Sequence, residues 1–311
     1  MTFEQLRIFL AVAEREHLTR AAEVLHLTPS AVSASIRALE LSYGVALFNR
    51  VGRRIELSDA GRLFLPEARA ILVRVGTAEA LIADLGGLKR GRLALQASQT
   101  IASHFLPPLM VAFQAAHPGV ALSLVIGNTE TVADAVAGGE AELGFVEGRI
   151  ASPLLDSRKV AEDRLIVVVP PGHPWADGAP LSVAALGTSR WVLRESGSGT
   201  RSSFAEALLA AGLAVDDLDV ALELPSNEAV LSAVASAPLA TVVSEAAASA
   251  MIAAGRLVRV DCALPPRAFL MLRHKERHQT TAALAFADLA VTGISPPAPP
   301  PPRSRRGIPG A

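Results

Sequence analysis

Two short segments combine hydroxyl side chains with backbone amides in a way that could hold an anion. Ser98, Gln99 and Thr100 follow a predicted strand at residues 93–97 and open a helix, whose free N–H groups favour negative charge. Residues 195–201 read E-S-G-S-G-T-R, in which the glycines leave the backbone amides free to form an oxyanion cradle. Arg201 ends that segment and supplies a positive charge.

Other polar side chains stand where predicted strands end, which is where open α/β sheets bind their ligands. Any one hydroxyl at a helix start is explained equally well as a plain N-cap, but several of them at strand ends favour a binding site. Glu147 complicates this interpretation, because a carboxylate repels an anion unless it is protonated, paired with Arg149 or Arg201, or bound to a ligand hydroxyl or ammonium group. The predicted site comprises Ser98, Gln99, Thr100, Asn128, Glu147, Ser196, Ser198, Thr200, Arg201, Ser226 and Asn227.

A third segment could bind nucleic acid. Between Asn49 and Ile55 the chain reads N-R-V-G-R-R-I, which places Arg50, Arg53 and Arg54 close together with no acidic residue among them. The formal net charge of the whole chain is -1, so a DNA-binding function must rest on where the charges lie. Most short basic runs are merely solvated surface, so this run needs support from its neighbours.

The residues before the basic run have the spacing of three short helices. Apolar residues recur from Leu6 to Ala13 with the periodicity of an amphipathic helix. Thr19 is expected to cap a second, short helix. Thr28 and Pro29 then supply an N-cap and a first helical residue, which starts a third helix after a tight turn. This layout predicts a helix-turn-helix.

One face of the third helix fits a major groove of DNA. Val32, Ile36 and Leu39 form its core stripe, and a step of 100° per residue places small, hydroxyl-bearing and basic residues opposite. Short side chains let the backbone approach the groove, while hydroxyls and arginine reach phosphates and base edges. The alternative is an ordinary helical bundle with a polar outer face. The residues on or beside this face are Ser30, Ser33, Ala34 and Arg37, preceded by Thr28.

Short apolar runs on either side of the basic run predict a β-hairpin wing. They span residues 45–48 and 55–57, and Gly52 allows a tight reversal between them. A wing beside a recognition helix carries its arginines to the adjacent phosphate backbone or minor groove, where they add salt-dependent affinity. This context favours DNA binding for the basic run.

A long helix with an unbroken heptad seam is predicted from Ser58 onward. Two-fold pairing along the seam would place two recognition helices on successive half-sites of one operator. Pro66 lies near the start of this helix and can bend its first turns. The alternative is that the seam packs on its own domain. The seam comprises Phe64, Ala68, Ile71, Val75, Ala78, Ile82 and Leu85.

The composition fits a soluble chain of two or three domains. Its 311 residues exceed one usual domain, 50% of them are apolar, and no apolar stretch reaches the length of a membrane span. The N-terminus places Glu4 and Arg7 among its apolar residues and lacks the pattern of a signal peptide, so we expect a cytoplasmic protein. The single cysteine, Cys262, cannot form an internal disulfide and has no metal-binding neighbourhood, so we expect neither a metal nor another cofactor.

After a hinge-like linker at residues 86–92, predicted strands and helices alternate as they do in an α/β domain. The predicted strands span residues 93–97, 121–126, 143–146, 165–169, 191–193 and 240–243. The predicted helices span residues 106–116, 131–137, 203–211 and 229–235. From Ser295 the chain is rich in proline and arginine, which predicts a disordered tail at residues 294–311.

Three N-terminal segments closely resemble the DNA-binding domain of LysR-type transcription regulators. They read F-E-Q-L-R-I-F-L-A-V-A-E, L-T-R-A-A-E-V-L-H-L-T-P-S-A-V-S-A-S-I-R-A-L-E and L-F-N-R-V-G-R-R-I-E-L-S-D-A-G. The resemblance implies an all-α winged helix-turn-helix that contacts bases and phosphates. Ala34 and Ser35 stand where many family members have longer polar or basic residues, which predicts weak direct base readout. The implied contact residues are Thr28, Ser30, Ser33, Ala34, Arg37, Arg50, Arg53 and Arg54.

The rest of the chain resembles the effector-binding domain of the same family, a two-lobed α/β domain similar to periplasmic binding proteins. The segments A-S-Q-T-I, G-N-T-E, G-F-V-E-G, L-R-E-S-G-S-G-T-R and P-S-N-E resemble the subgroup that contains regulators of sulfur assimilation and of Calvin-cycle genes. Pro238 lies where the family has a glycine-rich turn, and is expected to reshape one side of the pocket. The resemblance divides the chain into residues 1–58, 59–91, 92–293 and 294–311, with lobe one at 92–163 and 267–292 and lobe two at 164–266.

Together these features predict a regulator whose promoter contacts are controlled by a small anionic effector bound between the two lobes. The expected partners are double-stranded promoter DNA, the effector, further copies of the chain in a homodimer or homotetramer, and RNA polymerase. An α/β enzyme and a cytoplasmic small-molecule-binding protein are the alternatives, since both use such clefts. The sequence contains no Gly-x-Ser-x-Gly, Walker, metal-binding or dinucleotide motif, which counts against an enzyme.

Overall fold

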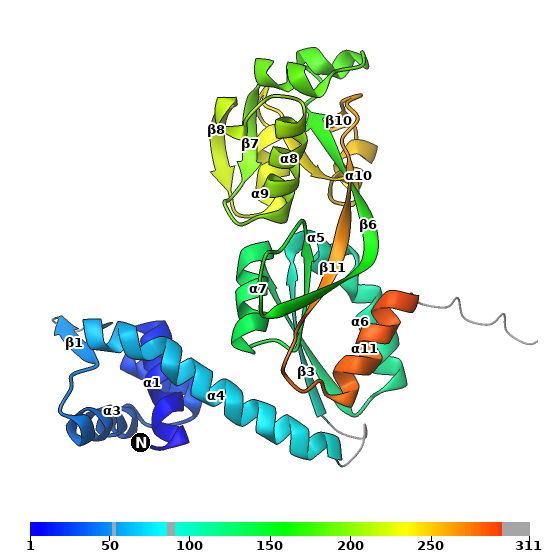
Figure 1. Cartoon of the computed structure of the whole chain (residues 1–311). Coiled ribbons are helices and arrows are strands. Elements are labelled where there is room, and N and C mark those ends of the chain that lie inside the picture. Colours follow the sequence, from blue (N-terminus) through cyan, green and yellow to red (C-terminus); the bar gives the residue numbers. More distant parts are fainter. Residues whose placement is uncertain (52–53, 86–90, 294–311) are drawn as a thin grey trace, which may run out of the picture.

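The computed structural model describes residues 1–51, 54–85 and 91–293 of the chain (Figure 1). A small helical domain with a two-stranded wing forms the N-terminal end, and the long helix α4 connects it to a two-lobed α/β part (Figure 1). The predicted tail and most of the predicted linker lie outside the described residues, while Gly91 and Arg92 belong to a strand and not to the linker. In the described ranges we find no helix with the length and apolar character needed to cross a membrane.

The N-terminal domain begins with three short helices whose caps define their starts. Thr28 Oγ1 accepts a hydrogen bond from the Ala31 N–H at 3.2 Å and Pro29 follows as the first helical residue, as predicted. The prediction that Thr19 caps the second helix is wrong: His17 takes this role, and its Nδ1 accepts from the Arg20 N–H at 3.4 Å. The elements are α1 (Phe3–Arg15), α2 (Leu18–Leu25), α3 (Pro29–Tyr43), β1 (Phe48–Val51), β2 (Arg54–Leu57) and α4 (Asp59–Leu85).

The wing is an antiparallel pair in which Phe48 faces Leu57. Its first strand starts at Phe48 and not at residue 45 as predicted, because the carboxylate of Glu40 accepts hydrogen bonds from the N–H groups of Leu47 and Phe48 at 2.8 and 3.1 Å and fixes the entering chain. Phe48 packs on Phe9, which is fully buried at the centre of the helical core. The predicted reversal at Gly52 lies outside the described residues.

The α/β part is built on a mixed sheet with strand order β10-β6-β11-β5-β3-β4, and β9 pairs with β6. The strands β6 (Leu155–Val169) and β11 (Pro266–His274) run antiparallel and pass between the lobes (Figure 1). The first part of β6 pairs with β11, and its last residues pair with β9 and β10. The prediction of a strand limited to residues 165–169 therefore missed ten residues of β6, whose charged side chains conceal the strand pattern.

Lobe one surrounds the parallel strands β3, β4 and β5. Its core contains Leu95, Phe113, Phe145 and Phe286, all fully buried. The helices on this lobe come from sequence segments far apart, since α11 packs beside α6 on the sheet (Figure 1). The further elements are β3 (Gly91–Ser98), α5 (Gln99–His104), α6 (Leu106–Ala116), β4 (Val120–Gly127), α7 (Thr129–Gly138), β5 (Leu143–Glu147) and α11 (Thr281–Thr292).

Lobe two surrounds the distal half of β6 and the parallel pair β7 and β8. Trp191, Phe204 and Leu208 lie fully buried in one of its cores. Near this core lies the buried His173, whose Nε2 is hydrogen-bonded to Ser189 Oγ at 2.9 Å. Its Nδ1 accepts a hydrogen bond from the Trp175 N–H at 3.1 Å. The further elements are η1 (Pro174–Asp177), η2 (Val183–Thr188), β7 (Arg190–Arg194), α8 (Gly199–Ala210), η3 (Val215–Asp217), β8 (Asp219–Leu224), α9 (Asn227–Val234), β9 (Thr241–Ser244), α10 (Glu245–Ala253) and β10 (Val258–Arg259).

Candidate DNA interface and effector site

The predicted recognition face of α3 lies on the surface. Ser30, Ala34 and Arg37 are exposed, and Ser33 is partly exposed beside them. Arg37 makes one hydrogen bond, from its Nε to the Ser33 carbonyl oxygen one turn earlier at 3.3 Å, so it stays available to a ligand. Thr28 Oγ1 also lies 3.0 Å from Ser30 Oγ at the start of the helix. The helix thus presents hydroxyls and one arginine on a face without a protein partner in the described chain.

The wing supplies the other predicted DNA contacts. The backbone of Arg50 pairs with Ile55, and that of Arg54 pairs with Val51. Two of the three predicted arginines therefore stand on paired strands, and Arg53 lies outside the described residues. A short, basic hairpin beside an exposed helix is the arrangement by which winged helix-turn-helix domains hold DNA through phosphates as well as bases.

The predicted dimerisation seam divides into two halves along α4. Ala68 is 0% exposed inside its own N-terminal domain, so its prediction as a dimer contact is wrong. Phe64 and Ile71 are partly buried against the same core. These three residues follow the alternative of packing on their own domain, because α4 closes the core of the helical bundle before it projects away. Farther along, Val75 is partly buried, Ala78 and Ile82 are exposed, and nothing is described of the Leu85 side chain.

Direct hydrogen bonds join the two lobes at the predicted effector site. Gln99 Oε1 accepts from the N–H of Asn227, the first residue of α9, at 2.6 Å, and Gln99 Nε2 donates to Glu228 at 3.0 Å. Asn227 Nδ2 in turn donates to Thr100 Oγ1 at 3.2 Å. The side chain of Asn227 also accepts from Arg194 Nη1 at 2.7 Å. The predicted residues Gln99, Thr100 and Asn227 therefore meet across the junction of the lobes.

A second set of contacts surrounds Arg267, which is buried on β11. Its Nη1 donates to Thr200 Oγ1 at 2.9 Å and its Nε donates to Asp163 at 2.8 Å. The buried carboxylate of Glu147 lies 3.8 Å from Arg267 Nη2. The prediction that Glu147 pairs with Arg149 or Arg201 is wrong, because Arg201 instead donates to the carboxylate of Glu223 and to the Arg194 carbonyl oxygen.

The polar side chains at helix starts fall into two groups. Ser226 and Asn128 are ordinary N-caps, since their side chains accept from the N–H groups of Ala229 and Thr131, both at 3.0 Å. Ser98 and Ser198 occupy the equivalent cap positions of α5 and α8 but make no side-chain cap bond. Ser98 is 3% exposed, and its Oγ has no hydrogen-bond partner among the described residues.

Unpaired buried polar groups are costly, so those found in folded proteins commonly mark a ligand or water site. Ser226, which caps its own helix, is therefore a structural residue, whereas Ser98, which caps nothing, is a candidate ligand contact. Ser196 lies outside both groups, on the exposed rim, where its N–H donates to Glu223 at 3.3 Å.

A recess opens beside part of the predicted site. It measures about 660 Å³ and is lined by Gln99, Asn128 and Glu195, together with residues of β4 and α7, and neither Ser98 nor Ser198 is among its lining residues. Within the described chain we find no group of three or more His, Cys, Asp or Glu side chains that could hold a metal ion.

Sequence reasoning missed Arg267, Arg194 and Glu195 at this junction. Arg267 follows two prolines, and no strand was predicted there, although the run A-F-L-M-L after it is a strand signal. Arg194 ends β7 and lies one residue beyond the predicted strand at residues 191–193. Its Nε donates to Glu195 at 2.7 Å, so it enters the junction already paired with a carboxylate.

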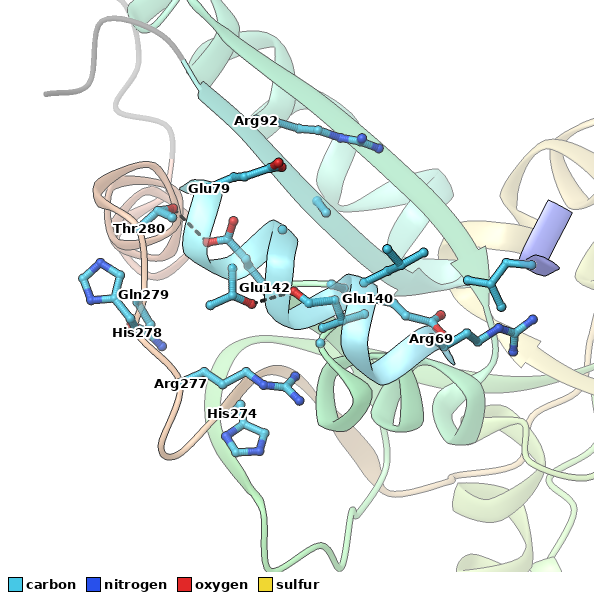
Figure 2. Close-up of a pocket in the computed structure, with 18 of the residues that line it drawn as sticks. Arg69, Glu79, Arg92, Glu140, Glu142, His274, Arg277, His278, Gln279 and Thr280 are labelled. Atoms are coloured by element: carbon cyan, nitrogen blue, oxygen red, sulfur yellow. Dashed lines mark hydrogen bonds between the residues drawn. The ribbon is translucent and has the colours of Figure 1, made fainter. Parts of the chain in front are cut away.

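A larger cavity, of about 710 Å³, lies between α4 and lobe one (Figure 2). Its walls carry charges of both signs, including those of Arg92, Arg277, Glu79 and Glu140. Burial, and then the charges of Arg277 and Arg74, lower the pKa of His274 in this wall. The mixed charge gives this cavity no preference for an anion. The recess at the junction is also of mixed charge, so the junction is preferred because of the buried Ser98 hydroxyl and not because of the charge of its lining.

Comparison with known families assigns both parts of the chain. Residues 3–62 match the bacterial regulatory helix-turn-helix protein family, lysR type, and residues 86–294 match the LysR substrate binding domain. The Escherichia coli K12 regulator YeiE, whose role is uncharacterised, is 32% identical over 93% of this chain and 96% of its own length. The RuBisCO operon transcriptional regulator of Allochromatium vinosum is 31% identical over 94% of this chain and 96% of its own length.

Solved structures agree with this assignment. Full-length CbnR in complex with its target DNA has a TM-score of 0.70 at 23% identity, covering 94% of this chain and 99% of that one, which establishes the shared fold. The regulatory domain of Synechocystis CcmR in complex with 2-PG has a TM-score of 0.60 at 26% identity, covering 65% of this chain and 97% of that one. The relatives are regulators and not enzymes, and include a regulator of the RuBisCO operon, as the predicted subgroup requires. The chain belongs to the LysR family of DNA-binding transcription regulators, with an N-terminal helix-turn-helix and a C-terminal effector-binding domain.

Proposed function

We propose that this regulator binds a small anion at the junction of its two lobes and that the bound anion changes how the protein contacts its promoter. The observation that carries the proposal is Ser98, a buried hydroxyl whose Oγ has no hydrogen-bond partner in the described chain. An O–H at this position can donate to a ligand oxygen, and the ligand then satisfies a group that is costly to leave unpaired.

Ser198 on lobe two is the counterpart of Ser98. It is buried, it precedes α8, and its hydroxyl makes no cap bond to that helix. The amides at the start of this 12-residue helix carry the positive end of the helix dipole, which favours an anion. One ligand held by Ser98 and Ser198 would therefore contact both lobes.

Charge at the junction restricts the kind of ligand. Arg194, Arg201 and Arg267 each have a carboxylate partner, so no arginine among them is left over as a counter-charge. Hydroxyl and amide donors must then bind the anion, and the carboxylate of Glu147 is balanced by Arg267 at 3.8 Å. These conditions favour a small oxyanion or a phosphorylated or carboxylated metabolite. The CcmR regulatory domain in complex with 2-PG supports a small ligand of this kind in the subgroup.

Gln99 supplies the link between ligand binding and lobe movement. Its side-chain carbonyl already accepts from the first N–H of α9, which is a position that a ligand oxygen could take over. A ligand that replaces this bond changes the contacts holding the lobes together. Because a ligand shifts a conformational equilibrium only through its different affinity for the two states, such an exchange could bias lobe closure and with it the promoter contacts.

The DNA-binding part of the proposal rests on α3 and the wing. We assign major-groove contact to Thr28, Ser30, Ser33, Ala34 and Arg37, and phosphate or minor-groove contact to Arg50, Arg53 and Arg54. The complex of CbnR with its target DNA, which shares this fold, supports the arrangement. We place the regulator in the cytoplasm, where promoter DNA is found, and expect pairing through the distal half of α4.

A thermal-shift screen tests the effector site. Sulfate, inorganic phosphate and a panel of phosphorylated and carboxylated metabolites are tested on the wild type, Ser98→Ala, Ser198→Ala and Ser226→Ala. A ligand that binds the native state raises its melting temperature, and the rise grows with ligand concentration relative to Kd. We expect one class of anion to stabilise the wild type and the Ser226→Ala control equally, and to stabilise the other two variants much less. Equal stabilisation of all four proteins would place the ligand elsewhere.

A further inference from the structure

We propose that helix α7 couples the junction of the lobes to the linker helix α4, so that loosening the contact at either end of α7 loosens the contact at the other end. This inference deepens the proposed function, which supplies the reason for lobe movement, but the coupling itself is a property of the chain without ligand or DNA. It follows from close contacts at both ends of α7. Figure 1 shows the position of this helix in lobe one.

The first turn of α7 is docked on lobe two. The Glu130 N–H donates to the Gly197 carbonyl oxygen at 3.3 Å, and Asn128 Nδ2 lies 3.5 Å from the Ser196 carbonyl oxygen. Gly197 has a φ of +83°, and a Cβ placed on it would lie 2.7 Å from the Glu130 carboxylate. A side chain at residue 197 would therefore have to displace the Glu130 carboxylate, and the positive φ favours glycine at this position.

The last turn of α7 is docked on the linker helix. Gly139 ends α7 with a φ of +88°, and a Cβ there would lie 2.5 Å from the Val73 side chain of α4. Arg277 holds this end in place by donating to the carbonyl oxygens of Val136 and Gly138 at 3.1 and 3.0 Å. Figure 2 shows Arg277 on this wall of the cavity beside α4. Besides its contact with β3, the linker helix thus touches, through Val73, the C-terminal end of the helix whose N-terminal end touches lobe two.

Helix α7 can transmit movement because it is short, capped and tightly seated. Its 10 residues span about 15 Å, and Asn128 and Thr131 form a reciprocal capping box at its start. Val132 and Val136 pack against Gly144 of β5, where a Cβ would lie 2.6 Å from Val136 Cγ2. Close-packed elements transmit strain and do not absorb it, so lobe one carries both docking surfaces as one rigid piece.

Coupling of two contacts through one rigid piece is reciprocal. Loss of the contact at Gly197 should weaken the docking of α4 near Val73, and loss of the Val73 contact should loosen the turn around Gly197. A purely local role for each contact predicts no effect at the far end. Measurement at the far end therefore separates coupling from local packing.

Hydrogen–deuterium exchange on the full chain without DNA or ligand provides the measurement. Gly197→Ala introduces a Cβ into the contact with Glu130 and strain at positive φ, while Gly212→Ala introduces the same strain at φ +80° in open space. Compared with Gly212→Ala, Gly197→Ala is expected to speed exchange of residues 69–79 of α4 by about threefold or more. Equal exchange of this segment in the two variants would overturn the proposal.

The reverse experiment keeps the test valid if Gly197→Ala does not fold. Val73→Ala removes the side chain that packs on Gly139, and Leu63→Ala shortens an exposed side chain of the same helix. Val73→Ala is expected to speed exchange of residues 195–199 in lobe two, and Leu63→Ala is not. An unchanged rate at residues 195–199 in Val73→Ala would contradict coupling through α7. Because no effector or promoter takes part, this outcome would leave the proposed anion site standing.

Discussion

The ring centroid of Phe64 in α4 lies 5.0 Å from that of Phe9 in α1, and this contact commits the start of the linker helix to its own DNA-binding domain. Ala68, one turn later, is fully buried in the same core. The helix therefore positions the recognition face of α3 rigidly before it reaches any partner. Among the seam residues whose side chains are described, those from Val75 to Ile82 remain for pairing with another copy of the chain.

Ile82→Asp should separate the oligomer while leaving the protomer folded. Ile82 is 72% exposed in the single chain, so the charge is harmless there, but it would be buried without a partner charge in a paired seam. Light scattering is expected to show a lower mass, with an unchanged far-ultraviolet spectrum. Leu63→Asp, on an exposed position of α4 outside the seam, is the control and should keep the native mass. A native mass for Ile82→Asp would refute distal pairing through this residue.

Arg37→Ala should weaken binding to the promoter without unfolding the domain. The side chain is exposed and bonds only within its own helix, and loss of one base or phosphate contact costs about 1–3 kcal/mol. Arg53→Ala on the wing should in addition lower the slope of affinity against salt by about one. Fluorescence anisotropy with labelled promoter DNA at several salt concentrations measures both. Arg190→Ala makes the same change of charge in lobe two, so Arg37→Ala binding as tightly as this control would remove α3 from the interface.

Ser98→Ala and Ser226→Ala should have opposite effects on the stability of the protein without ligand. Ser98 Oγ has no hydrogen-bond partner in the part of the chain that the structure describes, so its removal should be neutral or stabilising by up to about 1 kcal/mol. Ser226 caps α9, and its removal should destabilise the chain by about 1 kcal/mol. Thermal denaturation followed by circular dichroism compares the two variants. Destabilisation of Ser98→Ala by as much as Ser226→Ala would show that Ser98 is a structural residue.

Lobe two should lose stability in mild acid because of His173. Burial lowers the pKa of this imidazole from its usual 6.5, and its Nδ1 must be neutral to accept from the Trp175 N–H. The folded pKa lies below the unfolded value, so the contribution to stability is complete above about pH 6.5 and is lost as the pH falls through the folded pKa.

The two tryptophans of the chain, Trp175 and Trp191, both lie in lobe two and report its unfolding by fluorescence. His173→Asn keeps an acceptor at this position but cannot titrate. Between about pH 7.5 and about pH 5 the urea midpoint of the wild type should fall more than that of the variant. An equal fall in both proteins would assign the acid sensitivity to other groups.

The sequence predicted the helix-turn-helix well because its signals are local. Thr28 and Pro29 cap and start a helix through contacts within four residues, and the strand at residues 191–193 is a continuous apolar run. The N-cap of α2 and the charged half of β6 were missed because they lack such local signals. His17 caps through a ring nitrogen that is not a usual cap acceptor, and residues 156–164 pair with β11, which is a distant segment.

The candidate effector residues were predicted as a group but not sorted into roles. Ser98 and Ser226 both precede helices, and the sequence treats them alike. In the structure Ser226 bonds the N–H three residues along its own helix, while Ser98 is buried without a hydrogen-bond partner among the described residues. Arg267 was missed because its importance comes from meeting Asp163 and Thr200 across the fold. Such roles depend on tertiary contacts that no local pattern contains.

The most direct test of the account is a DNase footprint on the chain's own promoter region, with and without the best anion from the thermal-shift screen. The account predicts that this anion alters the footprint of the wild type and of Ser226→Ala, and leaves that of Ser98→Ala unchanged. All three proteins should bind the promoter equally well without the anion, because Ser98 and Ser226 lie far from α3 in the chain. A footprint of Ser98→Ala that responds to the anion as the wild type does would contradict control of promoter contacts from this site.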